Sequence, residues 1–363
     1  MSVLWLVALT IAFAVFQGMV FRYYNFRRLS YSRRFDKTCA YEGERVELLE
    51  NIENKKMLPV PWLRAESRIP KQLAFEKEHL DAHEVSGGLY HKSIFYLSPM
   101  CRITRHHEVL LKKRGAYDAG SVVITCGDLF SIARSERHMD LDCNITVYPR
   151  ILPDDQLPDP AHKWLGDLSV KRWIMPDPFL VNGIRDYRAG DSLKDVHWRA
   201  SARTGDLRVK VRDFTSDPKA MVVLNIQTSD NQWADVGESD ADNMEQAIRI
   251  AATMCVRALK NGMQAGFASN ACLDKKAGSG ECICLPSRSG GEQADRILDT
   301  MAHLILHREL SFSTFLESLM HLRGEDILIL SFYETEEIIR QMNELRKNGN
   351  TVALLRLDRR KAA

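Results

Sequence analysis

The sequence predicts a multidomain protein with three folded parts: an N-terminal transmembrane helix, an all-β sandwich domain and a C-terminal three-layer α/β domain. An uncharged apolar run opens the chain, short β-rich segments separated by turn residues follow it, and strands then alternate with helical patterns. At 363 residues the chain is too long for one compact core of ordinary size. We expect an anchor at 1–35, a sandwich at 36–150, a linker at 151–182 and the α/β part at 183–363.

The opening run, residues 3–21, carries no charge and is long enough to cross a bilayer, which takes about 20 helical residues. Arginines follow it at positions 22, 27, 28, 33 and 34. A cleaved signal peptide would need a basic residue before the apolar run and a small-residue cleavage site after it, and neither is present. By the positive-inside rule we expect a single-pass anchor in the inner (cytoplasmic) membrane. Its N-terminus would lie outside, its body in the cytoplasm, and residues 3–28 would contact lipid.

Bulk composition indicates a globular protein and excludes a dedicated nucleic-acid binder. Apolar residues make up 45% of the chain and charged residues 27%, and the formal net charge is only +2. The eight cysteines are scattered and form no disulfide framework. Cys272, Cys282 and Cys284 could in principle hold a metal, but a lone C-x-C lacks the paired C-x-x-C spacing of a zinc site. We expect reduced thiols and no cofactor.

The segment from Thr38 to Arg150 contains about seven short strand-like runs bounded by Gly, Pro, Asn or Asp, which is typical of a β-sandwich. Adjacent residues on a strand point to opposite faces. His106 and His107 therefore cannot chelate one ion together, and we expect one ring inside and one outside.

Five of the twelve prolines fall within 151–178, which is typical of a domain linker, and Trp164 and Trp173 suggest that the linker is packed. After Lys219 the pattern changes to strands alternating with helices, which predicts a parallel sheet covered on both faces. The strands are expected at 220–226, 264–270, 326–332 and 350–357, and the helices at 240–261, 292–307, 313–322 and 334–349.

The stretch GIRDYRAGDSLKDVHWRASAR, from Gly183 to Arg203, concentrates reactive and charged residue types. Asp191 is a candidate N-cap for a helix ending at Gly205, with Leu193, Val196, His197 and Ala200 on one face. The next residues, 207–212, alternate between apolar and basic side chains. A loop, a short helix and a strand with a basic stripe are therefore predicted.

This stretch allows two interpretations. In the catalytic one, His197 is a general base oriented by Asp191 or Asp195, and Ser201 is the nucleophile. In the structural one, Arg185, Arg188 and Arg203 pair with Asp186, Asp191 and Asp195, while Tyr187 and Trp198 are buried and His197 forms a hydrogen bond. The strained turn that normally exposes a serine nucleophile is missing, so we favour the structural interpretation and expect no catalytic residues.

The signature residues resemble those of the bacterial domain-of-unknown-function family number 58. The residues that carry the resemblance are Gly183, Arg185, Tyr187, Gly190, Asp191, His197, Trp198, Ser201, Ala202 and Arg203. Lys194 stands where the family usually has Arg. Weaker matches lie at Arg114-Gly115 with Tyr117, and at Asp128 with Phe130, where Leu129 and Ser131 replace the usual Pro and Gly.

The resemblance implies a membrane-associated protein whose C-terminal part is similar to a von Willebrand factor A domain and whose family is linked with MoxR-type AAA+ ATPases. A metal-binding A domain has D-x-S-x-S after its first strand, because a hard cation needs carboxylate and hydroxyl oxygens. Here Asn225, Gln227 and Ser229 occupy those positions, and we expect no metal.

We therefore expect a non-enzymatic, membrane-anchored adaptor that docks a MoxR-type ATPase or its client. The docking surface would comprise the α/β domain and the Gly183–Arg212 unit, including the basic stripe of Arg208, Lys210 and Arg212. Two alternatives remain open: a Ser/His-dependent hydrolase that uses His197, and a divalent-cation-dependent protein-binding A domain.

Overall fold

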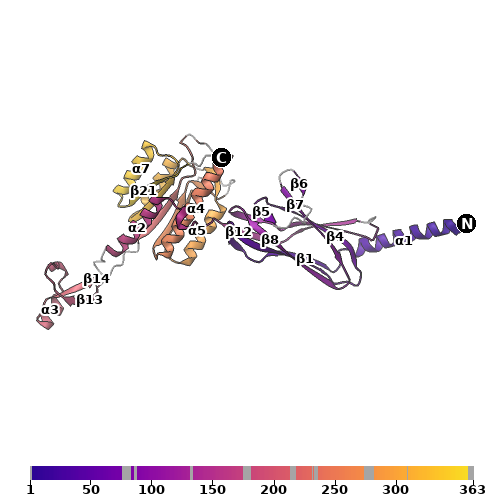
Figure 1. The fold of residues 1–363 in the computed structure, drawn as a ribbon, viewed down its shortest axis with the longest axis horizontal. Helices are drawn as coiled ribbons and strands as arrows, with labels where there is room; N and C mark the ends of the chain where they lie inside the picture. The colour runs from indigo at the N-terminus through magenta and orange to yellow at the C-terminus, as the bar shows by residue number, and fades with distance from the viewer. Residues whose placement is uncertain are drawn as a thin grey trace. The chain divides into compact units, whose positions relative to one another are not determined.

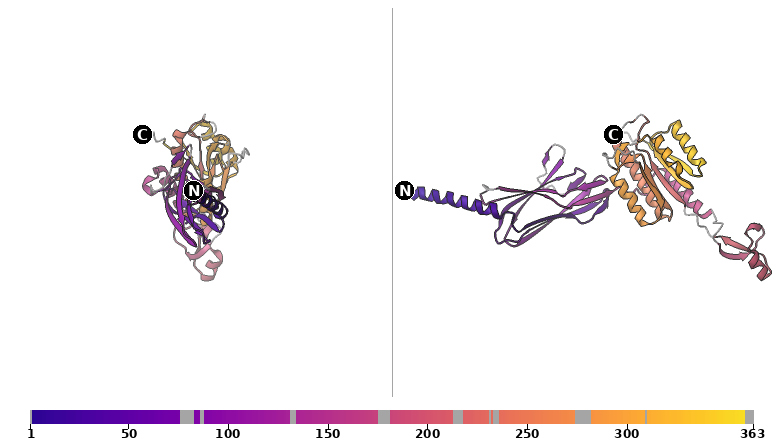
Figure 2. Two further views of the ribbon diagram at one scale, coloured as in Figure 1. Left: turned by 90° about the vertical axis from the view of Figure 1, so that its right-hand side faces the viewer. Right: turned by 180° about the vertical axis from the view of Figure 1, so that it is seen from behind.

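The computed structural model divides the chain into two compact units, Met1–Arg150 and Ile151–Ala363, and each is described by itself (Figures 1 and 2). The residues that the structure describes are 2–75, 83–85, 88–130, 134–174, 181–212, 218–230, 232, 236–273, 282–308 and 310–358.

The first unit begins with helix α1, Ser2–Tyr24. Its segment Leu4–Tyr24 has a mean hydropathy of 2.2 and is long and apolar enough to cross a membrane. Most of its large apolar side chains are exposed, so the helix is not part of a protein core. The helix expected from the apolar run is confirmed.

A β-rich body follows α1, and its described residues form twelve strands where the sequence predicted about seven. Strands β2, β5 and β6 have only three residues each, which is too short to show an alternating pattern. The strands are β1 (Leu29–Phe35), β2 (Cys39–Tyr41), β3 (Arg45–Asn54), β4 (Val60–Ile69), β5 (Leu73–Phe75), β6 (His83–Val85), β7 (Gly88–Leu97), β8 (Cys101–Leu111), β9 (Gly115–Asp118), β10 (Ser121–Gly127), β11 (Arg134–Asp140) and β12 (Asn144–Tyr148).

These strands form three sheets, in the orders β1-β3-β8-β5, β11-β10-β4-β7-β6 and β2-β12-β9. Nearly all pairs are antiparallel; β2 and β12 are parallel. One apolar cluster gathers around Leu48, Val109 and Ile145, and a second around Ile52 and Phe95. Inward-facing residues of the sheets thus build the core.

A polar cluster is buried between two of the sheets. Tyr31 on β1 donates a hydrogen bond to Glu50 Oε1 on β3 at 2.5 Å, and Glu50 Oε2 lies 3.2 Å from His107 Nε2 on β8. The ring of His91 on β7 meets that of His107 edge to face, with centroids 5.1 Å apart. Arg33 on β1 donates to Ser67 at 2.7 Å. All of these side chains except His107, which is partly buried, are buried.

The neighbour of His107 on the same strand points the other way. His106 is exposed, and its Nδ1 lies 3.1 Å from a carboxylate oxygen of Glu47. The expected placement of one ring inside and one outside is confirmed, and the two histidines do not form a metal site.

The second unit begins where the sequence suggested a linker, and that expectation is wrong for much of the segment. Residues 154–156 form a 3₁₀ turn, and helix α2 spans Asp159–Ile174. Pro158 precedes the helix and Pro160 lies in its first turn, where a missing N–H costs nothing. Trp164 is buried, and α2 contacts helix α4 and strand β21. The Trp173 side chain lies outside the described residues.

The remaining elements of this unit are β13 (Val181–Asp186), α3 (Trp198–Thr204), β14 (Arg208–Arg212), β15 (Lys219–Leu224), α4 (Glu238–Lys260), β16 (Gln264–Ser269), β17 (Ala271–Cys272), β18 (Ile283–Arg288), α5 (Gly291–His303), β19 (Ile305–Arg308), α6 (Phe312–Ser318), β20 (Glu325–Ser331), α7 (Glu336–Lys347) and β21 (Thr351–Arg356). The main sheet has the order β18-β16-β15-β20-β21. All its pairs are parallel except that of β16 with β18, an edge strand that the sequence did not reveal.

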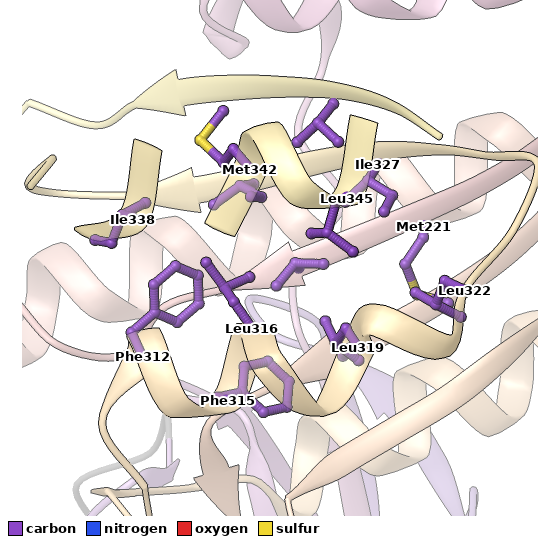
Figure 3. Packing of buried hydrophobic residues seen from close by; sticks show 14 residues of the cluster. Met221, Phe312, Phe315, Leu316, Leu319, Leu322, Ile327, Ile338, Met342 and Leu345 are labelled. Carbon is purple, nitrogen blue, oxygen red and sulfur yellow. The ribbon is translucent and has the colours of Figure 1, made fainter. Parts of the chain in front are cut away.

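The main sheet is covered on both faces, as its apolar strands predicted. On one face Met221 and Ile327 pack against α6 and α7 through Phe315, Ile338 and Leu345 (Figure 3). The alternate residues of β15 are buried as well, and α4 and α5 contact each other and strand β16. This cover leaves the carboxyl ends of the parallel strands as the natural place for a site.

Candidate functional site

The signature stretch folds as a hairpin that carries a short helix. Strands β13 and β14 pair antiparallel, with Arg185 opposite Val209 and a bulge between Val181 and Gly183. Val196 forms a bridge to Val209 on the other edge of β14. Both valines are buried, so they form the small apolar centre of this unit. We call residues 181–212 the signature unit.

A bidentate ion pair fixes the loop after β13. The Arg185 guanidinium donates to both carboxylate oxygens of Asp191, at 2.6 and 2.7 Å. Asp191 also accepts the backbone N–H of Arg188 at 2.8 Å. The guanidinium and this N–H lower the pKa of the Asp191 carboxyl to about 2, and Asp191 raises the pKa of Arg185. Gly190 allows the tight turn, because its φ of 109° is disfavoured for other residues.

The predicted single helix from Asp191 to Gly205 is interrupted. Residues 193–195 form one 3₁₀ turn capped by Ser192, Val196 is extended, and α3 starts only at Trp198. Asp191 is not an N-cap, because its carboxylate is bound to Arg185. Consequently Leu193, Val196, His197 and Ala200 do not share one helical face. The predicted end is confirmed: Gly205 is the C-cap, with φ 79°.

His197 and Ser201 make hydrogen bonds to the backbone rather than a catalytic pair. His197 Nδ1 accepts the N–H of Ala200 at 3.1 Å and thereby caps α3. Ser201 Oγ accepts the N–H of Arg208 at 2.8 Å and donates to the His197 carbonyl oxygen at 3.1 Å. The Ser201 hydroxyl thus donates its hydrogen bond to the backbone carbonyl of His197 and not to the imidazole ring. The ring is therefore not placed to take the hydroxyl proton.

A second ion pair of the unit joins two residues that the sequence did not pair. Arg208 Nη1 lies 2.8 Å from Asp186 Oδ1, because these two residues are directly opposite each other on β14 and β13. Arg188 and Arg203 are exposed. Strand alternation places Lys210 on the same face as Arg208, as predicted, and the side chain of Arg212 lies outside the described residues.

Large apolar side chains on the signature unit are exposed, contrary to the expected burial of the tryptophan. Trp198 is 65% exposed and Leu193 is 64% exposed. Trp198 is the first residue of α3, with its side chain outside the Val196–Val209 centre. Tyr187 is partly buried. The exposed large apolar residues of the unit are Ile184, Leu193, Trp198, Leu207 and Val211. Ile184 pairs with Lys210 and therefore lies on the other face of the hairpin from Val211.

The second candidate region lies at the carboxyl end of the main sheet, where a metal-binding A domain would hold its ion. Asn225 donates to Ser331 Oγ at 3.0 Å and accepts the N–H of Gln227. Gln227 Oε1 accepts the N–H of Phe312 at 2.8 Å. Asn270 Oδ1 accepts the Ile226 N–H at 3.0 Å. Neutral amide side chains therefore occupy the carboxyl end of the main sheet.

The remaining predicted position at this edge is different. Ser229 is exposed and lines a hollow of about 460 Å³ with Asp230, Glu334, Arg356 and Asp358. The hollow lies beyond the ends of β15, β20 and β21, as expected for this kind of sheet. Among the described residues, no group of three or more His, Cys, Asp or Glu side chains is placed to hold a metal ion.

Sequence comparison identifies relatives of unknown function. Residues 183–361 match the family described as "Protein of unknown function DUF58". The chain is also 23% identical over 259 residues to the uncharacterized protein YeaD of Bacillus subtilis, which covers 71% of this chain. The chain spans only 59% of the length of that relative. Both matches are similarities to proteins of unknown function.

Structure comparison finds chains of low similarity. A non-cellulosomal cohesin from Archaeoglobus fulgidus is 14% identical and covers 37% of this chain and 96% of its own, with a TM-score of 0.22. The CARDB domain of the PF1109 protein of Pyrococcus furiosus is 12% identical and covers 34% of this chain and 96% of its own, with a TM-score of 0.21. We draw no conclusion from TM-scores this low.

Proposed function

We propose that this chain is a non-enzymatic, membrane-anchored adaptor that binds a soluble MoxR-type AAA+ ATPase or its client through the signature unit. The observation that carries the proposal is the contrast within that unit. Its polar signature residues Arg185, Asp191, His197 and Ser201 make hydrogen bonds inside the unit, whereas Trp198 and its apolar neighbours face outward. Exposed aromatic residues beside basic ones are typical of protein-binding surfaces.

The anchor in this proposal is helix α1. Its outward apolar side chains include Trp5 at 76% and Leu9 at 73% exposure, which suits a lipid environment. Arg22, Arg27 and Arg28 lie at or just after its C-terminal end. By the positive-inside rule, these arginines favour a cytoplasmic body at the inner membrane and an N-terminus outside.

The class of partner is what the resemblance implies. The signature residues of this chain resemble those of the DUF58 family, which is linked with MoxR-type ATPases, and the exposed Trp198 and Leu193 provide apolar surface that a folded partner could cover. Aromatic and arginine side chains dominate the binding energy of such surfaces. The hollow beyond β15, β20 and β21, lined by Ser229 and Arg356, adds a second surface of the α/β domain that a partner could use.

Two alternatives receive less support from the geometry. A Ser201 hydrolase needs the imidazole of His197 within reach of the hydroxyl, but Ser201 bonds the backbone of His197 and Arg208 instead. A cation-dependent A domain needs free oxygen ligands, but the side chains of Asn225 and Gln227 are used within the amide network.

Binding of the detergent-solubilised full chain to a purified MoxR-type ATPase tests the proposal. The ATPase is titrated with and without ATP against wild type, Trp198→Ala and the charge-reversed Arg208→Glu/Lys210→Glu variant. We expect Trp198→Ala to weaken binding by at least tenfold, since a buried interface tryptophan is worth about 2 kcal/mol or more. Arg340→Glu, an exposed position on α7, is the matched control. Unchanged binding in both signature variants would refute the proposed surface.

Catalysis has a separate test. His197→Gln and Ser201→Ala remove the two groups that the hydrolase alternative requires, and circular dichroism shows whether each variant still folds. We expect both folded variants to retain ATPase binding. Complete loss of biological function in a folded His197→Gln variant that still binds the ATPase would favour the hydrolase.

A further inference from the structure

Helix α1 joins the end of the β body at which several strand connections meet. Strands β1, β4, β8 and β11 begin there, and β3, β7 and β10 end there, as their antiparallel registers show. Backbone hydrogen bonds tie these connections together, from Lys55 N–H to the Arg28 carbonyl at 2.9 Å and from Met100 N–H to the Lys56 carbonyl at 3.2 Å. If α1 crosses a membrane, this end of the body faces the lipid surface.

Large apolar side chains are exposed on three of these connections. Met57 is 81% exposed between β3 and β4, Met100 is 67% exposed between β7 and β8, and Leu129 and Phe130 are 63% and 59% exposed after β10. Turn residues are usually polar, so large apolar side chains that face water at these positions are unusual. Their shared position next to α1 indicates an apolar partner at this end.

The loop after β10 extends along α1 rather than stopping at its end. Asp128 is fully buried and accepts a hydrogen bond from Gln17 Nε2 at 2.7 Å. Gln17 lies roughly 10 Å along the helix axis from Tyr24, at about 1.5 Å per residue. Phe130 reaches further, because it lines an apolar hollow together with the part of α1 between Leu9 and Phe16.

The same junction carries positive charge at the level where α1 ends. Arg27, Arg28 and Lys56 line a hollow of about 780 Å³ together with Tyr24 and Met57. Lys56 Nζ donates to the carbonyl oxygens of Tyr24 and Asn25, at 2.7 and 2.6 Å, and so satisfies the end of the helix. The guanidinium groups of Arg27 and Arg28 are exposed beside it.

We propose that the loop after β10 is a second membrane contact: Leu129 and Phe130 enter the acyl layer beside α1, and Arg27 and Arg28 bind the phosphates of anionic lipid headgroups. The inference deepens the proposed function and rests on its membrane anchor. The partner is a bilayer surface. Leu129, Phe130 and the apolar side chains of α1 lie where the acyl chains would be, and the exposed arginines after α1 lie where the headgroups would be. The hydrogen bond from Gln17 Nε2 to Asp128 gives this amide nitrogen a partner within the apolar part of α1, and it holds Asp128 against the helix.

Photocrosslinking of the full chain in vesicles of phosphatidylcholine and phosphatidylglycerol at 3:1 tests the depth of the loop. p-Benzoylphenylalanine is placed at one site per sample, in place of Phe130, Phe13 or His138. Phe13 lies in α1, and His138 is an exposed residue of β11, the strand that the loop leads into. After irradiation, mass spectrometry detects protein that carries one covalently bound lipid.

We expect lipid adducts at positions 130 and 13 and none at 138. An adduct at 13 without one at 130 would overturn this inference and leave the anchor intact. Absence of an adduct at 13 would overturn the anchor itself, and this inference with it. An adduct at 138 equal to that at 130 would also overturn the inference, because the loop would then be no closer to lipid than the rest of its hairpin.

The headgroup contact has its own measurement. The full chain is purified from the same vesicles, and the ratio of retained phosphatidylglycerol to phosphatidylcholine is measured. We expect at least a twofold enrichment of phosphatidylglycerol, lost in Arg27→Gln/Arg28→Asn; Asn is chosen because Arg28 has a φ of 49°, which Asn tolerates. Arg137→Gln, on β11 away from the junction, should keep the enrichment. No enrichment in wild type, or equal loss in the control, would overturn the role of the arginines.

Discussion

The buried polar cluster of the β body and the signature unit use the same kinds of residue in opposite surroundings. Each contains arginine, a carboxylate, histidine, tyrosine and serine. Glu50 in the first is 1% exposed, whereas the Asp191 side chain in the second is 18% exposed and its partner Arg185 is 41% exposed. Removing one member of a buried charged network leaves the others without a partner or water, whereas exposed groups are rehydrated. The first cluster should therefore contribute to stability, and the second mainly to the shape of a surface.

The largest effect that tests this contrast is expected for Glu50→Gln. This change leaves Tyr31, His107 and the nearby Arg33 without the carboxylate between them, which should reduce the free energy of unfolding of the β body by about 3 kcal/mol. Hydrogen exchange of β3 and β8 amides in urea measures the loss in the full chain. Glu47→Gln, on the exposed side of the same strand, is the control, and an equal effect of both changes would contradict the contrast.

Acid should destabilise the β body before it affects the signature unit. Burial lowers the pKa of His91 to about 3, and hydrogen bonds from His107 and Tyr31 outweigh burial to lower that of Glu50 to about 2. Both groups then bind protons more readily in the unfolded chain, so stability falls as the pH falls from about 6.5 toward 3.

The contributions of His91 and Glu50 to the stability of the β body fall in different pH ranges and can be measured separately. Between pH 6.5 and 4.5 the loss comes from His91, and below 4.5 Glu50 adds to it. A His91→Gln variant should lose the upper part of this dependence, worth about 1 kcal/mol or more. Exchange of the β7 amides at each pH measures this dependence. An identical pH profile for wild type and variant would show that His91 does not titrate in this way.

Within the signature unit, Ser201→Ala should cost about 1 kcal/mol of local stability, because the Arg208 N–H and the His197 carbonyl each lose a hydrogen bond. Faster exchange of the Arg208 amide reports this loss. Unchanged exchange there would mean that the hydroxyl does not hold β14 against α3, and would reopen the catalytic interpretation.

The smallest effect on stability is expected for Asp191→Asn. The Arg185–Asp191 pair is partly exposed to solvent, so its loss should loosen the loop after β13 without unfolding the unit. Because the pKa of Asp191 is lowered to about 2, wild type should keep this loop ordered until the pH falls through the range from about 4 to 2. Amide exchange at Arg188 measures both changes, and a global loss of protection in Asp191→Asn would contradict the contrast.

The sequence predicted the elements that have a clear period. Helix α1, helix α4 and the parallel strands β15, β16, β20 and β21 follow from apolar runs or three- and four-residue spacing. The linker prediction failed because prolines mark both linkers and helix starts, and Pro158 and Pro160 lie at the start of α2. Edge strand β18 has the sequence ICLPSR, which does not alternate between apolar and polar residues, although the burial of its residues does alternate.

The candidate site shows where local reasoning ends. The Arg185–Asp191 pair and the stop at Gly205 could be predicted, because their partners are close in sequence. The break at Val196 could not, since it depends on the bridge of Val196 to Val209 across β14. The buried cluster was missed entirely, because Arg33, Glu50 and His91 come from separate strands and form no motif until the sheets face each other.

The account depends most on the claim that the signature unit presents a binding surface and no reaction centre. Hydrogen exchange of the full chain with and without a purified MoxR-type ATPase tests this claim directly. The account predicts slower exchange in residues 193–211, around Trp198, on addition of the ATPase, and no such protection in Trp198→Ala. Binding of the ATPase without any change in exchange across these residues would contradict it.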